Sequence, residues 1–116
     1  MVQTEYFLTC WIIINQLIEK MNQYLVTGYD HTDDGALKRR MDVRPHHLDG
    51  VRAMIAKGNY HTGGAILNDE GKMIGSVMIL QFDTEEELEA WKQGEIYITQ
   101  KIWESVDIKP FKVAQV

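Results

Sequence analysis

The chain has 116 residues, of which 45% are hydrophobic and 25% are charged, a composition typical of one globular domain. Its 12 Lys and Arg residues stand against 17 Asp and Glu residues, and the densest basic run is Lys38 to Arg40. Because phosphate binding needs a concentrated positive face, we expect no nucleic-acid partner and interpret this run as solvated surface. The single cysteine excludes an internal disulfide, and no Cys/His cluster indicates a metal site, which together favour a reducing cytoplasm.

Residues 1–20 differ from the remainder, which we treat as one domain over residues 21–116. The segment Tyr6 to Ile18 is apolar but interrupted by polar residues, and a bilayer span needs about 20 apolar residues. Glu5 precedes it where a secretory signal would carry Lys or Arg, so we expect neither export nor a membrane partner. Two interpretations stay open: an additional helix, or an extension ahead of a true start at Met21. The helix would have an apolar face of Phe7, Trp11, Ile14 and Ile18.

The first half of the domain predicts a strand followed by a helix. Asn22 to Tyr29 is short, apolar and partly β-branched, as strands are. Good helix formers begin at Ala36, and helical spacing of apolar residues continues until Gly58. Pro45 predicts that this helix is kinked or broken near its middle, because proline disrupts a helix interior.

The second half predicts a hairpin, a helix and a final strand. Tyr60 to Leu67 and Met73 to Phe82 are strands joined by a polar turn. Thr84 to Glu87 matches a capping box, which predicts a helix ending near Gly94. Glu95 to Trp103 predicts a further short helix. Val106 to Val113 is the last strand, which Pro110 restricts to an edge or a bulge.

This order predicts an α+β domain of βαββαβ type, in which two helices cover one face of a four-stranded antiparallel sheet. The strand Met73 to Phe82 is apolar on both of its alternating faces. Two helices can shield only one face of the sheet. We therefore expect the other face to associate with a second copy of the chain as a homodimer.

Two adjacent histidines have different positions on the helical wheel. With Leu48, Val51 and Ile55 taken as the buried stripe, His47 projects beside it and His46 projects toward solvent. His47 is therefore the candidate for an enclosed site, although a hydrogen-bonded histidine at the edge of the core would have the same pattern. The two rings point about 100° apart, so the pair does not predict a shared metal.

Other polar and small residues are candidates for binding a ligand. Gly63-Gly64 weakens a strand and predicts either a bulge or a close approach by ligand or backbone. Ser76 offers a hydroxyl to a cavity wall, or packs tightly in the sheet. Tyr97 lines a pocket or completes the core. Arg44 is a better anion-binding candidate than the basic run, because it lies beside the same helix end as the histidine.

A family resemblance follows from these residues. The segment Arg44-Pro45-His46-His47-Leu48 resembles the R-P-x-H-L motif of the YciI-like (YCII-related) family. At family spacing it is followed by Gly64, Gly75-Ser76, the capped second helix and Ile108 to Lys112, so that the resemblance covers about residues 21–116. It implies a dimeric ferredoxin-like α/β barrel and an enzymatic site with a histidine and an aspartate.

The carboxylate of the implied site differs from the family pattern. Relatives typically read Asp-Pro-Tyr after the second helix, whereas this chain reads Glu95-Ile96-Tyr97. The resemblance therefore assigns the histidine to His47 and the carboxylate to Glu95, with one additional methylene and without the proline. Family activities concern small, often cyclic or halogenated molecules, and no particular substrate carries over.

The sequence thus favours a small-molecule enzyme of lyase or isomerase type. His47 would be its general acid and base and Glu95 would orient it, because histidine exchanges protons near neutral pH. Its predicted substrate-binding residues are Arg44, Gly64, Ser76 and Tyr97. The alternative is a non-catalytic, ligand-binding or stress-associated homodimer that uses the same pocket. We expect no cofactor and no metal; haem bound by a histidine is a third, separate hypothesis.

Overall fold

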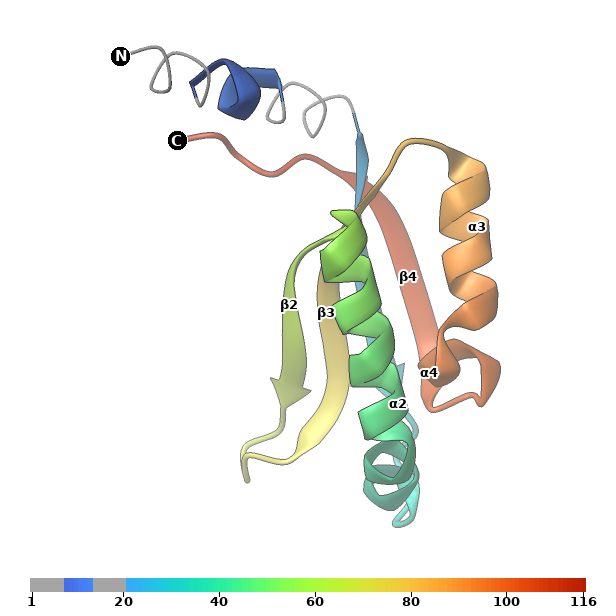
Figure 1. Cartoon of the computed structure of the whole chain (residues 1–116). Coiled ribbons are helices and arrows are strands. Elements are labelled where there is room, and N and C mark those ends of the chain that lie inside the picture. The colour runs from blue at the N-terminus through green and yellow to red at the C-terminus, as the bar shows by residue number, and fades with distance from the viewer. Residues whose placement is uncertain (1–7, 14–20) are drawn as a thin grey trace.

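The protein is described by a computed structural model that covers residues 8–13 and 21–116. The order of its strands and main helices is the predicted βαββαβ arrangement (Figure 1). The elements are β1 (Asn22–Asp30), α2 (Ala36–Lys57), β2 (Tyr60–Leu67), β3 (Met73–Phe82), α3 (Glu85–Gly94), α4 (Ile96–Thr99) and β4 (Trp103–Phe111).

The four strands form one antiparallel sheet in the order β2-β3-β1-β4. The helices lie on one face of this sheet, and α3 lies on its β4 side (Figure 1). Helix α2 contacts β1 and β2, and α3 contacts β3, the strand that precedes it in the chain. Pro110 lies in the edge strand β4, as predicted, because its nitrogen cannot donate to a neighbouring strand. The hairpin strands β2 and β3 have the predicted bounds.

Helix α2 is continuous from Ala36 to Lys57, so a break near Pro45, one of the two predicted forms, is wrong. One proline removes one backbone hydrogen bond, whereas buried side chains on both sides of it hold the two halves against the sheet. The buried face consists of Ala36, Arg40, His47, Val51 and Met54. Ile55, which was expected in the stripe, is 56% exposed because the stripe follows a seven-residue spacing through position 54.

The two short helices are separated by one residue. Thr84 caps α3 and accepts a hydrogen bond from the backbone N–H of Glu87 at 3.3 Å, as the capping box predicts. Glu95 ends α3 and caps α4. Helix α4 is shorter than the predicted Glu95 to Trp103, because Lys101 adopts a left-handed conformation with φ of 55° and the chain then enters β4.

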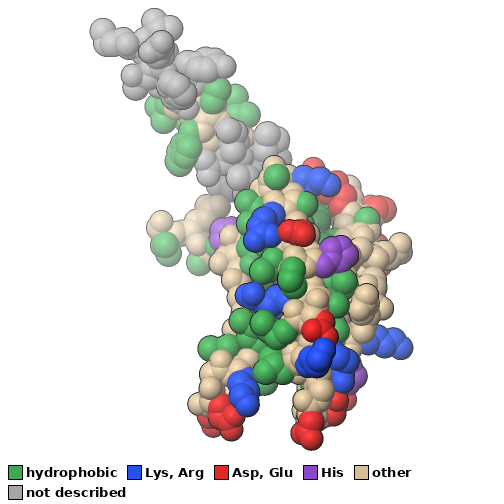
Figure 2. All heavy atoms as spheres, turned by 60° about the horizontal axis from the view of Figure 1, so that its bottom comes forward, with side chains coloured by type: hydrophobic (Ala, Val, Ile, Leu, Met, Phe, Trp, Pro, Cys, Tyr) green, Lys and Arg blue, Asp and Glu red, His purple; other side chains and the backbone are tan. Residues whose placement is uncertain are grey.

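The core lies between the helices and the sheet. Its buried hydrophobic residues are Tyr24, Val26, Val51, Met54, Met78, Leu80, Phe82, Leu88, Tyr97, Ile102 and Trp103. At the end of the molecule where α2 begins, hydrophobic side chains also reach the surface between two projections that carry charged groups (Figure 2). The chain therefore leaves apolar surface outside the core.

Residues 8–13 form a short helical segment in which Trp11 is 63% exposed. The remaining members of the predicted N-terminal apolar face, Phe7, Ile14 and Ile18, lie outside the described residues. Among the helices that the structure describes, none combines the length and the apolar character that crossing a membrane requires.

Candidate functional site

The centre of the candidate site is a pair formed by His47 and Glu95. The Nδ1–H of His47 donates to Glu95 Oε1 at 2.7 Å, and both side chains are buried. A carboxylate only accepts hydrogen bonds, so the bond assigns the proton of the neutral imidazole to Nδ1. Within the described part of the chain, Nε2 of His47 has no hydrogen-bond partner. His46, the adjacent residue, is exposed, as the helical wheel predicts.

Local backbone structure holds the carboxylate of Glu95 in place. As the N-cap residue of α4, its side chain accepts from the backbone N–H of Tyr97 at 3.1 Å. The same oxygen, Oε1, therefore receives the N–H groups of both His47 and Tyr97. The position that the family resemblance gave to the carboxylate is thus a cap that aims it at the histidine.

The ring of Tyr97 lies directly against the imidazole. The centroids of the Tyr97 and His47 rings are 4.1 Å apart and their planes differ by 13°. The guanidinium of Arg40 lies over the same tyrosine ring, 4.8 Å from its centroid. Tyr97 is fully buried, so within one chain it supports the histidine from inside the core rather than opening to solvent.

Arg40 corrects one expectation from the sequence. The run Lys38 to Arg40 was interpreted as solvated surface, but the Arg40 side chain is buried and only its two neighbours face solvent. Its Nη1 donates to Asp30 Oδ1 at 2.9 Å and its Nη2 donates to Ser76 Oγ at 2.7 Å. The reason is helical spacing: Arg40 lies seven residues before His47 and shares its buried face.

The remaining predicted residues divide between two faces of the sheet. Arg44 is half-buried on α2, one helical turn from Arg40, and it forms no ion pair with any described residue. Ser76 is buried beneath the helices and already bonded to Arg40. Gly64 lies in register with Val77, one residue from Ser76, and so belongs to the opposite face. Within one chain it does not reach His47.

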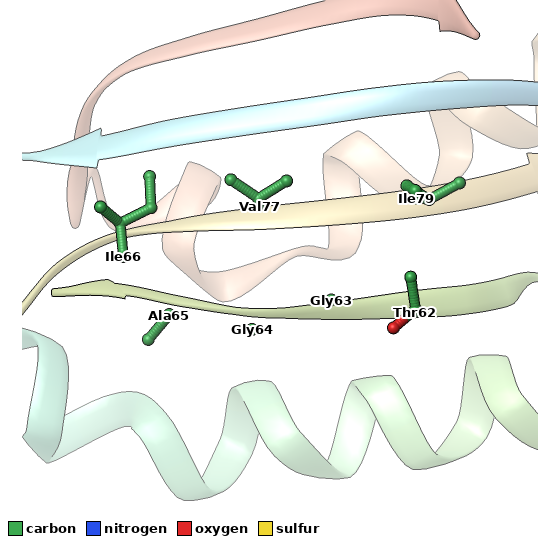
Figure 3. A pocket seen from close by; sticks show the side chains of 7 residues that line it. All are labelled: Thr62, Gly63, Gly64, Ala65, Ile66, Val77 and Ile79. Carbon is green, nitrogen blue, oxygen red and sulfur yellow. The ribbon is translucent and has the colours of Figure 1, made fainter. Parts of the chain in front are cut away.

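Gly64 instead lies in a shallow depression of about 280 Å³ on the face of the sheet that the helices leave open. Figure 3 shows its lining, which comes from the strands β2 and β3. The lining residues are Thr62, Gly63, Gly64, Ala65, Ile66, Val77 and Ile79. The strand has no bulge at the glycine pair. Instead, neighbouring atoms lie very close to the backbone of Gly63, because a Cβ there would overlap the Val77 carbonyl and the Tyr60 hydroxyl.

Burial raises the pKa of two groups beside the pair. Burial of Asp30 raises the pKa of its carboxyl group above 3.8, an effect that the nearby Arg40 charge opposes. Burial likewise raises the pKa of Tyr97, against the charges of Arg40 and Arg44, so its phenol stays neutral at physiological pH. Among the described residues, no group of three or more His, Cys, Asp or Glu side chains is placed to hold a metal ion.

Sequence reasoning missed Asp30 and Arg40. Asp30 ends the alternation Tyr24, Val26, Gly28, Asp30, all of which are buried on the helix side of β1. This period of two would have placed the carboxylate on the inner face, and a period of seven on α2 would have placed Arg40 above it. Strand alternation and helical spacing, rather than charge clustering, were the available signals.

The fold and the pair together define a small βαββαβ domain in which a histidine of α2 forms a buried pair with a carboxylate at the start of α4. The model of the YCII-related domain matches residues 22–112. The chain is 32% identical over 95 residues to Protein YciI from Escherichia coli, an alignment that covers 77% of this chain and 95% of that protein. This chain therefore belongs to the YCII-related family.

Solved structures show the same fold. The 5-chloro-2-hydroxyhydroquinone dehydrochlorinase from Burkholderia phenoliruptrix, in complex with 2,5-dihydroxybenzoquinone, matches with a TM-score of 0.67 at 20% identity. That match covers 79% of this chain and 95% of the enzyme. A dimeric ferredoxin-like protein from an uncultured marine organism matches with a TM-score of 0.51 at 12% identity, covering 85% and 94% of the two chains. The ferredoxin-like fold predicted from the sequence is thus confirmed.

Proposed function

We propose that this protein is a small-molecule enzyme of lyase or isomerase type, in which His47 exchanges a proton with the substrate. The observation that carries the proposal is the Nδ1–H bond to Glu95, which leaves the lone pair of Nε2 available. A neutral imidazole held in this tautomer accepts a proton at Nε2, and the Glu95 carboxylate stabilises the imidazolium that forms.

The proton balance of this step suits both reaction types. His47 takes a proton from a carbon next to a carbonyl or similar group, and the electron pair stays on the substrate. In an isomerase the proton returns to another atom; in a lyase the electron pair expels a leaving group. A protein of the same fold is a dehydrochlorinase by name, which is a reaction of the second type. At 20% identity, that name suggests a direction for substrate screening only.

Arg44 is the residue that we assign to an anionic or carbonyl-bearing substrate. It lies on α2 three residues before His47, is half-buried, and its charge is not neutralised by an ion pair with any described residue. Arg40 cannot take this role in the same way, because its side chain is buried and its two Nη groups already bind Asp30 and Ser76. Ser76 therefore supports Arg40 in this proposal and Gly64 lies apart from the site.

Proton exchange provides a test that does not require the natural substrate. Small cyclic ketones, quinols and carboxylic acids with acidic C–H groups are incubated in D₂O, and loss of their proton NMR signals is followed. We expect the wild type to accelerate exchange of some compounds, and His47→Gln to slow it by about 10²- to 10⁴-fold, the usual contribution of a general base. Arg44→Gln should weaken the apparent affinity for anionic compounds only.

The matched control is His46→Gln, the same substitution one residue away on the exposed face of α2. It should leave the exchange rate unchanged. Equal effects of the two substitutions would contradict the proposal. Binding of a compound by wild type, measured by chemical-shift changes without any accelerated exchange, would favour the non-catalytic ligand-binding alternative.

A further inference from the structure

Tyr97 contacts both members of the proposed catalytic pair. Its backbone N–H donates to Glu95 Oε1 at 3.1 Å, and its ring is stacked on the imidazole of His47 at 4.1 Å. The 13° angle between the two planes means that the imidazole cannot rotate about its χ2 without meeting the tyrosine ring. One residue thus restrains the acceptor of the hydrogen bond through its backbone and the donor through its side chain.

Tyr97 is itself held firmly on its other sides. The indole of Trp103 packs edge-on against its ring, with centroids 5.5 Å apart and planes at 64°. The Arg40 guanidinium lies over the ring and is fixed by its bonds to Asp30 and Ser76. A fully buried ring with such neighbours has little freedom, so it can transmit their rigidity to His47.

The phenol group takes no part in these contacts. The Tyr97 hydroxyl oxygen is buried and has no hydrogen-bond partner among the described residues. What restrains His47 and Glu95 is therefore the aromatic ring and the backbone N–H, both of which phenylalanine also provides. This separates a role in positioning from a role of the hydroxyl in proton transfer.

We propose that Tyr97 is a positioning residue that fixes the plane of the His47 ring and, with Glu95, keeps the neutral imidazole in the Nδ1–H tautomer with Nε2 available. This inference rests on the proposed function, because it explains how the proposed base is presented. It also changes the role predicted for Tyr97 from the sequence, where it was expected to bind substrate directly.

The test compares Tyr97→Phe and Tyr97→Leu by ¹⁵N NMR of the histidine ring nitrogens in the ligand-free protein, at a pH where His47 is neutral. We expect wild type and Tyr97→Phe to show His47 in one tautomer, with the proton on Nδ1. Tyr97→Leu should lose this single state and show exchange between the two tautomers. If Tyr97→Leu does not fold, Tyr97→Met, whose longer and more adaptable side chain reaches further into the space without a flat ring, should show the same loss.

The control is Tyr24→Leu, which makes the same change at another buried tyrosine. Tyr24 lies near the start of β1, whereas Asp30, the partner of Arg40, is at the end of that strand. It should leave the His47 signals unchanged. If it alters them as much as Tyr97→Leu does, or if His47 keeps one tautomer without the Tyr97 ring, the positioning role is overturned. Because the readout needs no turnover, it remains valid if no substrate is found, and the failure of the enzymatic proposal can be separated from the failure of this one.

Discussion

The buried ion pair of Asp30 and Arg40 is an unusual feature at the scale of single residues. Both side chains are at most 3% exposed, and only one oxygen of the carboxylate has a partner within the described chain. Buried charges are costly unless they are paired, so each of these two residues requires the other. Ser76 and the ring of Tyr97 complete the surroundings of the guanidinium.

Replacing Arg40 should therefore destabilise the protein far more than replacing its neighbour. We expect Arg40→Met to lower the free energy of unfolding at pH 7 by about 3–5 kcal/mol, the usual cost of leaving one member of a buried pair alone. Arg39→Met, which removes only an exposed pair with Asp33, should have little effect. Urea unfolding of both variants measures this, and comparable losses would contradict a buried role for Arg40.

The cost of Arg40→Met should also depend on pH. The folded pKa of Asp30 is above its unfolded value of 3.8 because of burial, and removal of the Arg40 charge raises it further. A carboxyl group whose pKa is higher in the folded than in the unfolded protein contributes stability that is fully present at a pH below the unfolded pKa. This contribution is lost as the pH rises through the folded pKa. The difference between wild type and variant should thus shrink as the pH is lowered from 7 toward 4. A stability difference between wild type and Arg40→Met that stays constant from pH 7 to pH 4 would contradict this role of the Asp30 carboxylate.

At the scale of elements, β1 and β4 meet at a contact that depends on the absence of a side chain. A Cβ built on Gly28 would overlap the indole ring of Trp103, which itself packs against Tyr97. Gly28 in β1 thus determines where Trp103 lies, and Trp103 in turn supports the tyrosine that contacts His47. The geometry of the site therefore depends on a strand residue that has no side chain.

Gly28→Ala should displace Trp103 and destabilise the fold. Inserting a methyl group into a packed core costs about 1–3 kcal/mol. Near-ultraviolet circular dichroism should report the altered tryptophan environment, and urea unfolding the lost stability. The control is Gly50→Ala on α2, where a Cβ meets no atom within 4 Å and alanine favours the helix. An unchanged spectrum and unchanged stability for Gly28→Ala would show that the indole relaxes freely.

The sequence predicted elements better than it predicted the site. Alternating apolar residues and turn residues were sufficient to predict the bounds of β2 and β3. The capping residue Thr84 was sufficient to predict the start of α3. The helix break that Pro45 suggested does not occur, since tertiary packing along α2 outweighs the loss of one backbone bond. The contact of Arg40 with Ser76 joins residues that are 36 positions apart, and such pairing depends on how the helix lies on the sheet. Local patterns do not contain this information.

At the scale of the whole molecule, the face of the sheet opposite the helices is uncovered in the single chain; it is apolar over the middle of β1 and β3, whereas β4 places Asp107 and Lys109 on it. Leu25 is paired with Ile79, and Thr27 with Val77, across β1 and β3, and all four are only half-buried. The depression around Gly64 continues this face onto β2. Stable homodimers bury about 1,200–2,000 Å² in total or more, and a four-stranded sheet face is of that order. A protein of similar fold is described as dimeric.

We therefore expect a homodimer that forms through this open face. Light scattering coupled to size exclusion at micromolar concentration should give twice the 13.4 kDa of one chain. Ile79→Asp should yield folded monomer, because a carboxylate at the centre of the interface would be desolvated without a partner. Ile55→Asp makes the same change on the helix side, where Ile55 is already 56% exposed, and should remain dimeric. A monomeric wild type, or a dimer that tolerates Ile79→Asp, would exclude association through this face and require another explanation for its apolar surface.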